Sequence, residues 1–398
     1  EAGRQYRGDM DRTNLFIFIN HEMKNGMEMF AEIGRYESNS LKKDNNGSFT
    51  AGIIAVPADY YWFSQLPSAL DFEMSKSVRI DGWRPLTMGR TTRVNKEDYR
   101  YLLGLRGITQ SNWSWESAIL YSRAKANDVT SGRVSFPKMY ASLNDPTSNA
   151  FNLFDPNPAT NNAETITQDV YRKDSSRLAS YDFKISNPAV YELPAGDVGM
   201  LVGFEYRKES YEDNRDPLLD GTIRLSGTSI TNTYPFRSAV MGSSATGDTI
   251  GNKKVRSAFI EFQVPVTEKL NAQIASRVES FSDSKSAAVY KIALGYDLND
   301  SIKLRGSTST AFRAPNLVQV NQKEVARTGT RDDTLMEYIS IENGQSVPTS
   351  GEIDGSYTVI RYAQGAEDLK PEESTNTSFG FVLTPAMVEG LTITVDTW

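Results

Sequence analysis

Polar and apolar residues alternate along much of the chain, the pattern of β-strands that present different surroundings to their two faces. The segment KLRGSTSTAFR at residues 303–313 is a clear example. One series of alternate positions contains Lys303, Arg305 and Arg313, and the series between them carries no charge. The pattern therefore predicts a strand with one wet, basic face and one face that avoids charge.

The same period-2 pattern recurs from one end of the chain to the other, whereas helical periodicity is hard to find. It predicts about a dozen strands. They lie near residues 13–22, 27–39, 98–107, 113–125, 178–186, 197–209, 253–264, 270–281, 288–297, 302–312, 374–384 and 391–398.

The connections between these strands alternate in length. Short turns such as KNG at 24–26 and DLND at 297–300 alternate with long stretches at residues 40–97, 126–177, 210–252 and 313–373. The gap at 282–287 is the one brief connection where a long one is expected. A regular alternation of this kind favours an antiparallel up-and-down β-barrel that crosses a membrane, with tight turns at one rim and long loops at the other.

The barrel interpretation explains the uncharged face. An arginine facing lipid at the bilayer midplane costs about 2–4 kcal/mol, so Lys303, Arg305 and Arg313 are expected to point into the lumen. Closure of the sheet also removes unpaired strand edges that hydrocarbon cannot satisfy. From Trp115 to Tyr121 the strand rises about 20 Å, close to the ~25 Å between the aromatic girdles of such barrels.

Composition narrows the classes of function. The 398 residues include no cysteine, which excludes disulfides and thiolate metal sites, and the net charge of −7 argues against a nucleic-acid partner. No apolar run approaches the roughly 20 residues of a membrane helix. The opening residues EAGRQYRGDM do not form a signal peptide, so a targeting segment is expected to be removed or to lie outside this chain.

Three motifs, in order, resemble those of TonB-dependent receptors. YELPAGDVGMLVGFEYRKES at 191–210 is similar to a strand of the family's large-loop members. LRGSTSTAFRAPNL at 304–317 is similar to its "FRAP" turn, and LKPEESTNTSFGFVLTP at 369–385 to the entry of the next strand. The resemblance implies a 22-stranded outer-membrane barrel of a Gram-negative bacterium, closed by an N-terminal plug. It implies import of a scarce nutrient, such as an iron chelate, cobalamin, an oligosaccharide or a peptide, powered through TonB. The expected partners are therefore membrane lipid, TonB, the receptor's own plug and the nutrient.

The chain departs from the family pattern at both ends. It shows no plug-like α/β segment and no TonB box, and it stops within the strand LTITVDTW. We therefore expect residues 1–398 to be a single barrel domain that lacks the plug and the terminal strands.

Two groups of residues are candidates for ligand binding. The inward arginines Arg207, Arg277, Arg305 and Arg313 would lie along a ligand pathway; alternatively, they pair with carboxylates of the wall or with a plug. Tyr60, Tyr61 and Trp62 cluster in a long outer loop. They would stack on a ligand, form the loop's own small core, or belong to the upper aromatic girdle.

The sequence gives little support for catalysis. His21 is the one histidine, and no nucleophile elbow, P-loop or dinucleotide fingerprint accompanies it. We expect no enzyme activity, no catalytic residues, no metal and no cofactor. Calcium is conceivable at 144–158 and 213–221, although turn chemistry accounts for their Asp, Asn, Pro and Gly residues.

Two other classes remain as alternatives. A secreted, soluble β-protein that binds carbohydrate would refold without detergent and would not enter liposomes. An outer-membrane barrel enzyme would need His21 as an essential base. The loops that would select a substrate are the least patterned part of the chain, so the sequence does not identify it.

Overall fold

A computed structural model of the chain describes residues 5–45, 54–67, 77–80, 83, 88–223, 238–332, 356–367 and 369–398. Its main element is one twelve-stranded sheet. The strands of this sheet are β1 (Asp9–Glu22), β2 (Glu28–Asn45), β5 (Gly89–Ile108), β6 (Ser114–Val134), β7 (Thr167–Leu193), β8 (Gly196–Arg215), β9 (Thr249–Thr267), β10 (Leu270–Phe281), β11 (Ala287–Asn299), β12 (Ile302–Arg313), β15 (Glu372–Leu383) and β16 (Ile393–Thr397).

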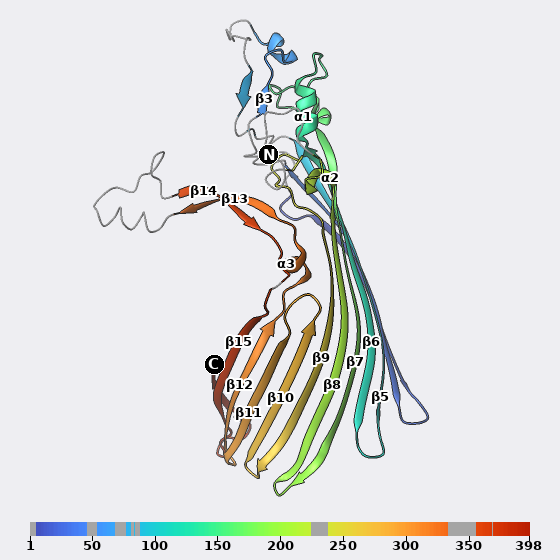
Figure 1. The fold of residues 1–398 in the computed structure, drawn as a ribbon, viewed down its shortest axis with the longest axis vertical. Coiled ribbons are helices and arrows are strands. Elements are labelled where there is room, and N and C mark those ends of the chain that lie inside the picture. Colours follow the sequence, from blue (N-terminus) through green and yellow to red (C-terminus); the bar gives the residue numbers. More distant parts are fainter. Residues whose placement is uncertain are drawn as a thin grey trace, which may run out of the picture.

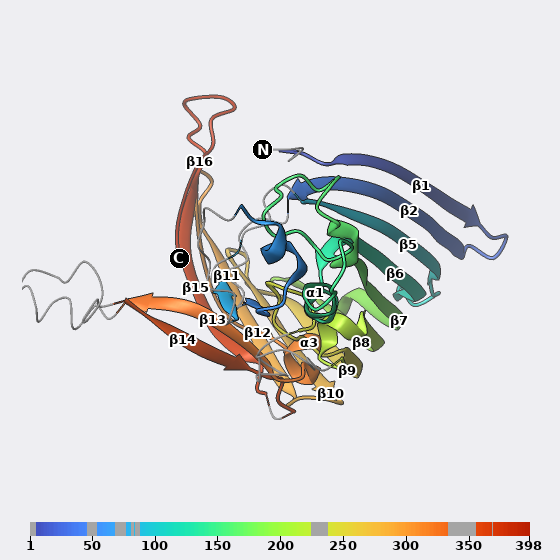
Figure 2. The same ribbon diagram turned by 90° about the horizontal axis from the view of Figure 1, so that it is seen from above.

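The strands follow one another across the sheet in this order, each antiparallel to its neighbours. The sheet curves into an open arc with β1 and β16 at its two edges (Figures 1 and 2). The helices α1 (Phe136–Leu143) and α3 (Leu317–Asn321) lie on the concave side of this arc in the view of Figure 2. The predicted up-and-down antiparallel architecture is confirmed.

Every predicted strand is present, but several are longer than the alternation indicated. β5 begins at Gly89 instead of residue 98, β6 continues to Val134 instead of 125, and β7 begins at Thr167 instead of 178. These extensions carry mainly polar residues on both faces, so they contain no regular alternation from which to predict a strand. Parts of the predicted loops 40–97 and 126–177 therefore belong to the sheet.

The long connections also contain secondary structure that was not predicted. Strand β3 (Ile54–Val56) pairs with β4 (Val78–Ile80), and β13 (Val325–Asp332) pairs with β14 (Ser356–Ala363) as a hairpin that projects from the sheet in Figure 1. Short helical turns occupy Tyr61–Gln65, Ala163–Thr165 and α2 (Pro217–Asp220). The brief β10–β11 connection agrees with the sequence interpretation.

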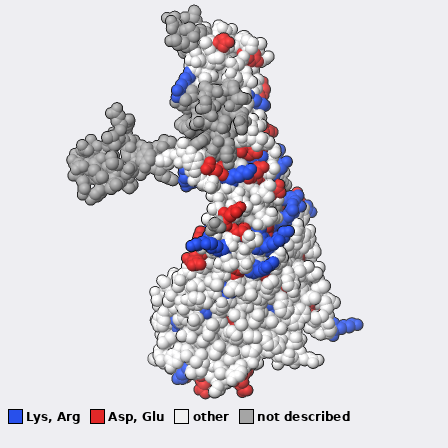
Figure 3. All heavy atoms as spheres, viewed as in Figure 1, with Lys and Arg blue, Asp and Glu red and all other residues white. Residues whose placement is uncertain are grey.

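The lower part of the convex face is apolar and exposed. Ile119, Phe204, Ile274 and Leu294 each expose more than two fifths of their surface. In Figure 3 the lower half of this face carries few charged side chains, and Lys, Arg, Asp and Glu gather above it. Within the part of the chain that the structure describes, no helix has the length and apolar character needed to cross a membrane.

The well-buried apolar core lies at the end of the sheet that carries the long connections. It joins residues of separate connections, including Val56, Phe63, Met139, Phe151 and Met241. This packing fixes the loops around 54–67, 136–166 and 238–245 against one another above the sheet.

Candidate functional site

The concave face of the sheet carries a continuous row of ionic side chains. Glu205, Arg207 and Glu209 alternate along β8, opposite Ser257, Val255 and Lys253 of β9. Arg207 and Glu209 line a cavity together with residues of α3, which lies on the concave side, so this row faces the inside of the arc. These charged side chains point inward, as the sequence pattern predicted.

Arg207 and Arg277 share the carboxylate of Glu205. Arg207 Nη1 donates to Glu205 Oε1 at 2.9 Å, and Arg277 Nη2 donates to Glu205 Oε2 at 2.8 Å. Arg277 Nε also donates to Glu279 at 2.6 Å, and Arg207 Nε donates to Glu209 at 3.1 Å. Two guanidinium groups thus hold three carboxylates of β8 and β10 on either side of β9, which fixes the orientation of both arginines.

An aromatic ring supports this network from below. Phe259 lies opposite Gly203 in the β8–β9 ladder, and the Arg277 guanidinium lies 5.4 Å from the centre of its ring. A Cβ atom at Gly203 would lie 2.2 Å from Phe259 Cζ, so the ring occupies the space that a larger residue would need. Gly203 is therefore required for the ring position on which Arg277 rests.

A buried lysine connects the wall to the turn after β12. Lys253 exposes 5% of its surface, and its Nζ donates to the Pro315 carbonyl oxygen at 2.7 Å. The turn then begins α3, where the Asn316 side chain accepts from the backbone of Gln319 and the Gln319 side chain accepts from the backbone of Asn316. This capping box stabilises a short helix that would otherwise be marginal.

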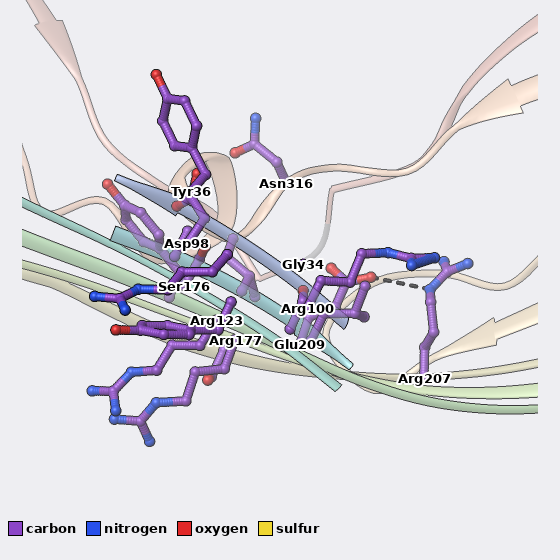
Figure 4. Close-up of a pocket in the computed structure, with 18 of the residues that line it drawn as sticks. Gly34, Tyr36, Asp98, Arg100, Arg123, Ser176, Arg177, Arg207, Glu209 and Asn316 are labelled. Atoms are coloured by element: carbon purple, nitrogen blue, oxygen red, sulfur yellow. Dashed lines mark hydrogen bonds and ion pairs between the residues drawn. The ribbon is translucent and has the colours of Figure 1, made fainter. Parts of the chain in front are cut away.

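Below α3 lies a cavity of about 840 Å³ against the wall formed by β1, β2 and β5–β8. Among its lining residues, Phe16, Gly34, Arg100 and Glu209 belong to the same side of the sheet by register. Figure 4 shows Tyr36 and Asn316 on one side of the strands, whereas Arg123 and Arg177 point to the other. Arg100 is held by an ion pair with Glu32. The cavity thus offers aromatic, amide and charged groups to a polar ligand.

A second charged group lies on the concave side of the upper extensions of β7 and β8. Arg172 Nε and Nη2 each donate to Asp213 at 2.9 Å, and Arg215 Nη2 donates to the same carboxylate at 2.9 Å. Burial raises the pKa of the neighbouring Asp174 to about 6, and its hydrogen bond with Asp213 adds to the rise. For Asp213, burial would raise the pKa, but hydrogen bonds from Arg172 and Asp174 outweigh it and lower the pKa.

The structure brings together two of the four predicted arginines. Arg207 and Arg277 meet at Glu205, whereas Arg305 donates to Asp396 of β16 at 2.8 Å and Arg313 lies 3.6 Å from Glu372. Arg313 thus pairs with a carboxylate of the adjacent strand β15, whereas Arg305 reaches across β15 to β16. Ligand binding by these four arginines remains a prediction.

The aromatic loop residues occupy different positions. Tyr60 exposes 2% of its surface; its hydroxyl donates to the Phe151 carbonyl and accepts from Leu153 N at 3.0 Å. Burial raises the pKa of Tyr60 to about 12. Trp62 Nε1 donates to the Ala150 carbonyl at 2.8 Å, and Tyr61 is partly exposed. Tyr60 and Trp62 thus serve the packing of the outer loops, as one alternative from the sequence proposed.

The remaining candidates have other surroundings. His21 is exposed on the convex side near the turn between β1 and β2. Asp145 accepts from the backbone of Thr147, and Asp155 from that of Asn157, as turn residues do. Across the described ranges, no group of three or more His, Asp or Glu residues could hold a metal ion.

The sequence interpretation missed several lining residues of the cavity. Arg100, Tyr36 and Asp98 lie within or next to predicted strands, and the strand register would have placed them on the inner face. Lys253 is the first residue of the predicted strand 253–264. Its partner Pro315 lies 62 residues away, so no local sequence pattern indicates their contact.

A curved antiparallel sheet with a charged concave face and an exposed apolar convex face defines the wall of a transmembrane β-barrel. The family model described as "TonB dependent receptor-like, beta-barrel" matches residues 34–398. The chain therefore belongs to the TonB-dependent receptor family, as the sequence motifs indicated.

Comparisons with individual proteins agree with this family. The chain is similar to a protein named "Probable TonB-dependent siderophore receptor PirA" from Acinetobacter baumannii, with 26% identity over 210 residues, which cover 52% of this chain and 23% of that protein. The chain thus matches about a quarter of this relative's length.

Two solved structures of the RagAB peptide importer share the fold. The "open-open" state has a TM-score of 0.52 and 12% identity, over 98% of this chain and 39% of that chain. The "closed-closed" state has a TM-score of 0.51 and 12% identity, over 94% and 38%. At this identity the similarity supports the fold alone.

Proposed function

We propose that this chain forms part of an outer-membrane receptor that imports a scarce nutrient with energy delivered through TonB. The observation that carries the proposal is the division between the two faces: apolar side chains are exposed on the convex face, and a fixed ionic network lines the concave face. A soluble carbohydrate-binding protein would leave the convex face in water. The division therefore favours the membrane importer over that alternative.

A ferric siderophore is the substrate class to test first, because the relative matched in sequence is named a probable siderophore receptor. The cavity below α3 would receive the substrate after capture by the outer loops. The plug and TonB act as partners in this proposal through family membership. The upper, loop-bearing rim then faces the outside of a Gram-negative cell.

The test uses the intact receptor in its own bacterium. Deleting the gene should abolish growth on one ferric siderophore as the iron source, and a plasmid copy should restore it. Restoration should fail in a strain without TonB. Growth on every siderophore offered, unchanged by the deletion, would exclude siderophore import, and radiolabelled peptide and vitamin uptake by the same strains would then test the broader importer proposal.

A further inference from the structure

One row of inward side chains crosses the cavity wall from β1 to β8. The strand register places six residues next to one another in this row, and all six line the cavity: Asn14, Tyr36, Asp98, Ala124, Ser176 and Tyr211. We call these six residues the Asp98 row. Ala124 and Ser176 are small, so the wall between Asp98 and Tyr211 leaves room for a ligand. Figure 4 shows Tyr36 next to Asp98, on the side of the strands on which Asn316 lies.

Among the charged residues on the inner side of this cavity, Asp98 alone has no partner in the described part of the wall. Its side chain is half-buried, and its carboxylate forms no hydrogen bond or ion pair with a described residue. Arg100, one inward position below on β5, pairs with Glu32. Arg207 pairs with Glu209. A ligand that fills the cavity removes water from Asp98, and a positive charge is then needed to offset the lost hydration.

Lys96 is the residue of the same strand that comes closest to supplying this charge. It lies one inward position above Asp98, but it is exposed, does not line the cavity and forms no ion pair with Asp98. Residues two apart on one strand are separated by about 7 Å, and an exposed ammonium group is strongly hydrated. Lys96 therefore leaves the Asp98 carboxylate free for a cation that enters the cavity.

Tyr36 adds an aromatic surface that suits a cation. It lies directly opposite Asp98 in the β2–β5 ladder, so the two Cβ atoms are about 5 Å apart. A cation held by the carboxylate can also lie over the face of the ring, whose quadrupole attracts positive charge. Asn14 and Ser176 of the same row offer neutral oxygen atoms that can accept further N–H hydrogen bonds.

We propose that the Asp98 row binds a positively charged nitrogen group of the imported ligand, an ammonium or a guanidinium, between the Asp98 carboxylate and the Tyr36 ring. The proposal rests on the import function given above and adds the charge that the ligand carries at this position. A siderophore with a free amine and a peptide with a basic side chain both present this chemistry, and the experiment distinguishes them.

The experiment measures dissociation constants by calorimetry for the intact receptor purified in detergent, with two matched pairs of probes. The first pair is the ferric complex of desferrioxamine B, which carries a free ammonium group, and the ferric complex of its N-acetyl derivative, which is neutral at that position. The second pair is a tripeptide with blocked ends and a central lysine, and the same tripeptide with that lysine acetylated. The members of each pair thus differ mainly in one charge.

The test variant is Asp98→Asn, which keeps the size of the side chain and removes its charge. The matched control is Asp128→Asn, because Asp128 belongs to the inward series of β6 but does not line the cavity. A second control, Lys96→Gln, removes the inward cation above Asp98.

We expect the charged probe of at least one pair to bind the unaltered receptor about tenfold more tightly than its acetylated form, because a partly shielded ion pair and a cation–π contact each contribute a few-fold in affinity. Asp98→Asn should abolish this preference, whereas Asp128→Asn and Lys96→Gln should keep it. The pair that shows the preference identifies the source of the cation, siderophore or peptide.

Three results would overturn the proposal: no preference for the charged probe in either pair, a preference that persists in Asp98→Asn, or an equal loss in Asp128→Asn. If Asp98→Asn does not fold, Tyr36→Leu takes its place, and the preference should then fall a few-fold through the loss of the ring. Growth on siderophores and dependence on TonB are not part of this readout. A failed import proposal would therefore not be mistaken for a failed cation site.

Discussion

Lys253 Nζ lies 2.7 Å from the Pro315 carbonyl oxygen and so ties β9 to the turn that follows β12. The ammonium group is buried and also lies 5.5 Å from the centre of the Phe281 ring. Pro315 precedes Asn316, the residue that caps α3, and α3 covers the cavity. The lysine therefore sets the position of the cavity's cover through one hydrogen bond.

Replacing Lys253 by methionine should loosen this cover while it keeps most of the side-chain volume. The Pro315 carbonyl would lose its buried donor, at a local cost of about 1–3 kcal/mol. Hydrogen exchange of the amides at 317–321 should then become faster by one to two orders of magnitude, roughly in proportion to that cost. Lys254→Met is the control, because Lys254 is exposed on the opposite face. Equal exchange in both variants would show that the lysine does not hold the turn.

Gly203 and Phe259 lead to a prediction about stability. Gly203→Val should displace the Phe259 ring, and with it Arg277, at a cost of about 1–3 kcal/mol for overpacking. Gly306→Val serves as the control, since the nearest atom to a Cβ there, the Ser378 carbonyl oxygen, is 3.6 Å away. The thermal midpoint, followed by the shift in gel mobility of the heated receptor, should fall for the first variant alone. A midpoint unchanged by Gly203→Val would contradict the tight contact.

Two ion pairs of the sheet, Glu205–Arg277 and Arg313–Glu372, are expected to have different coupling energies. A double-mutant cycle between Glu205→Gln and Arg277→Met should give about 0.5–1 kcal/mol, because these side chains are partly shielded and hydrogen-bonded. The cycle between Arg313 and Glu372 should give close to zero, since they are 67% and 68% exposed at 3.6 Å. Denaturant unfolding in detergent measures both. Equal coupling energies would mean that partial burial does not strengthen the Glu205–Arg277 pair relative to the exposed Arg313–Glu372 pair.

The sequence predicted the membrane-spanning part of the fold better than the rest, for a physical reason. Lipid on one side and polar lumen on the other impose strict alternation, as in Val198–Tyr206, so each crossing strand could be predicted. Above the membrane both faces of β6 and β7 are polar, and no alternation remains to predict their extensions. The hairpin β13–β14 lies in a segment with no such constraint.

The candidate site could be predicted only in part for a related reason. The inward series of β8 placed Glu205 and Arg207 correctly, because orientation follows from the period of two. Partners cannot be read from that period: the Arg277–Glu205 contact depends on the register of β8, β9 and β10 together. The burial of Tyr60 depends likewise on the packing of the segment around Phe151, 91 residues away.

The raised pKa of Asp174 predicts how the upper extensions of β7 and β8 respond to pH. Its pKa is raised from 3.8 to about 6 in the folded protein, so the folded state holds this proton more tightly than the unfolded state does. Stability from this group is therefore greatest at low pH and is lost as the pH rises from about 4 to about 6, after which it stays constant. Hydrogen exchange of the upper β7–β8 amides should be more strongly protected at about pH 5 than at about pH 7.5, after correction for intrinsic rates.

The variant Asp174→Asn separates this effect from other titrations. The amide cannot ionise and can still donate to Asp213, so the pH dependence of protection between pH 5 and 7.5 should disappear, with protection at the higher pH restored. Asp155→Asn is the matched control, because hydrogen bonds from Thr160 and the Asn157 backbone lower the pKa of Asp155 and keep its titration below this range. If Asp174→Asn retained the full pH dependence, the proton would reside on another group, and the shared Asp174–Asp213 hydrogen bond would not be the source of the response.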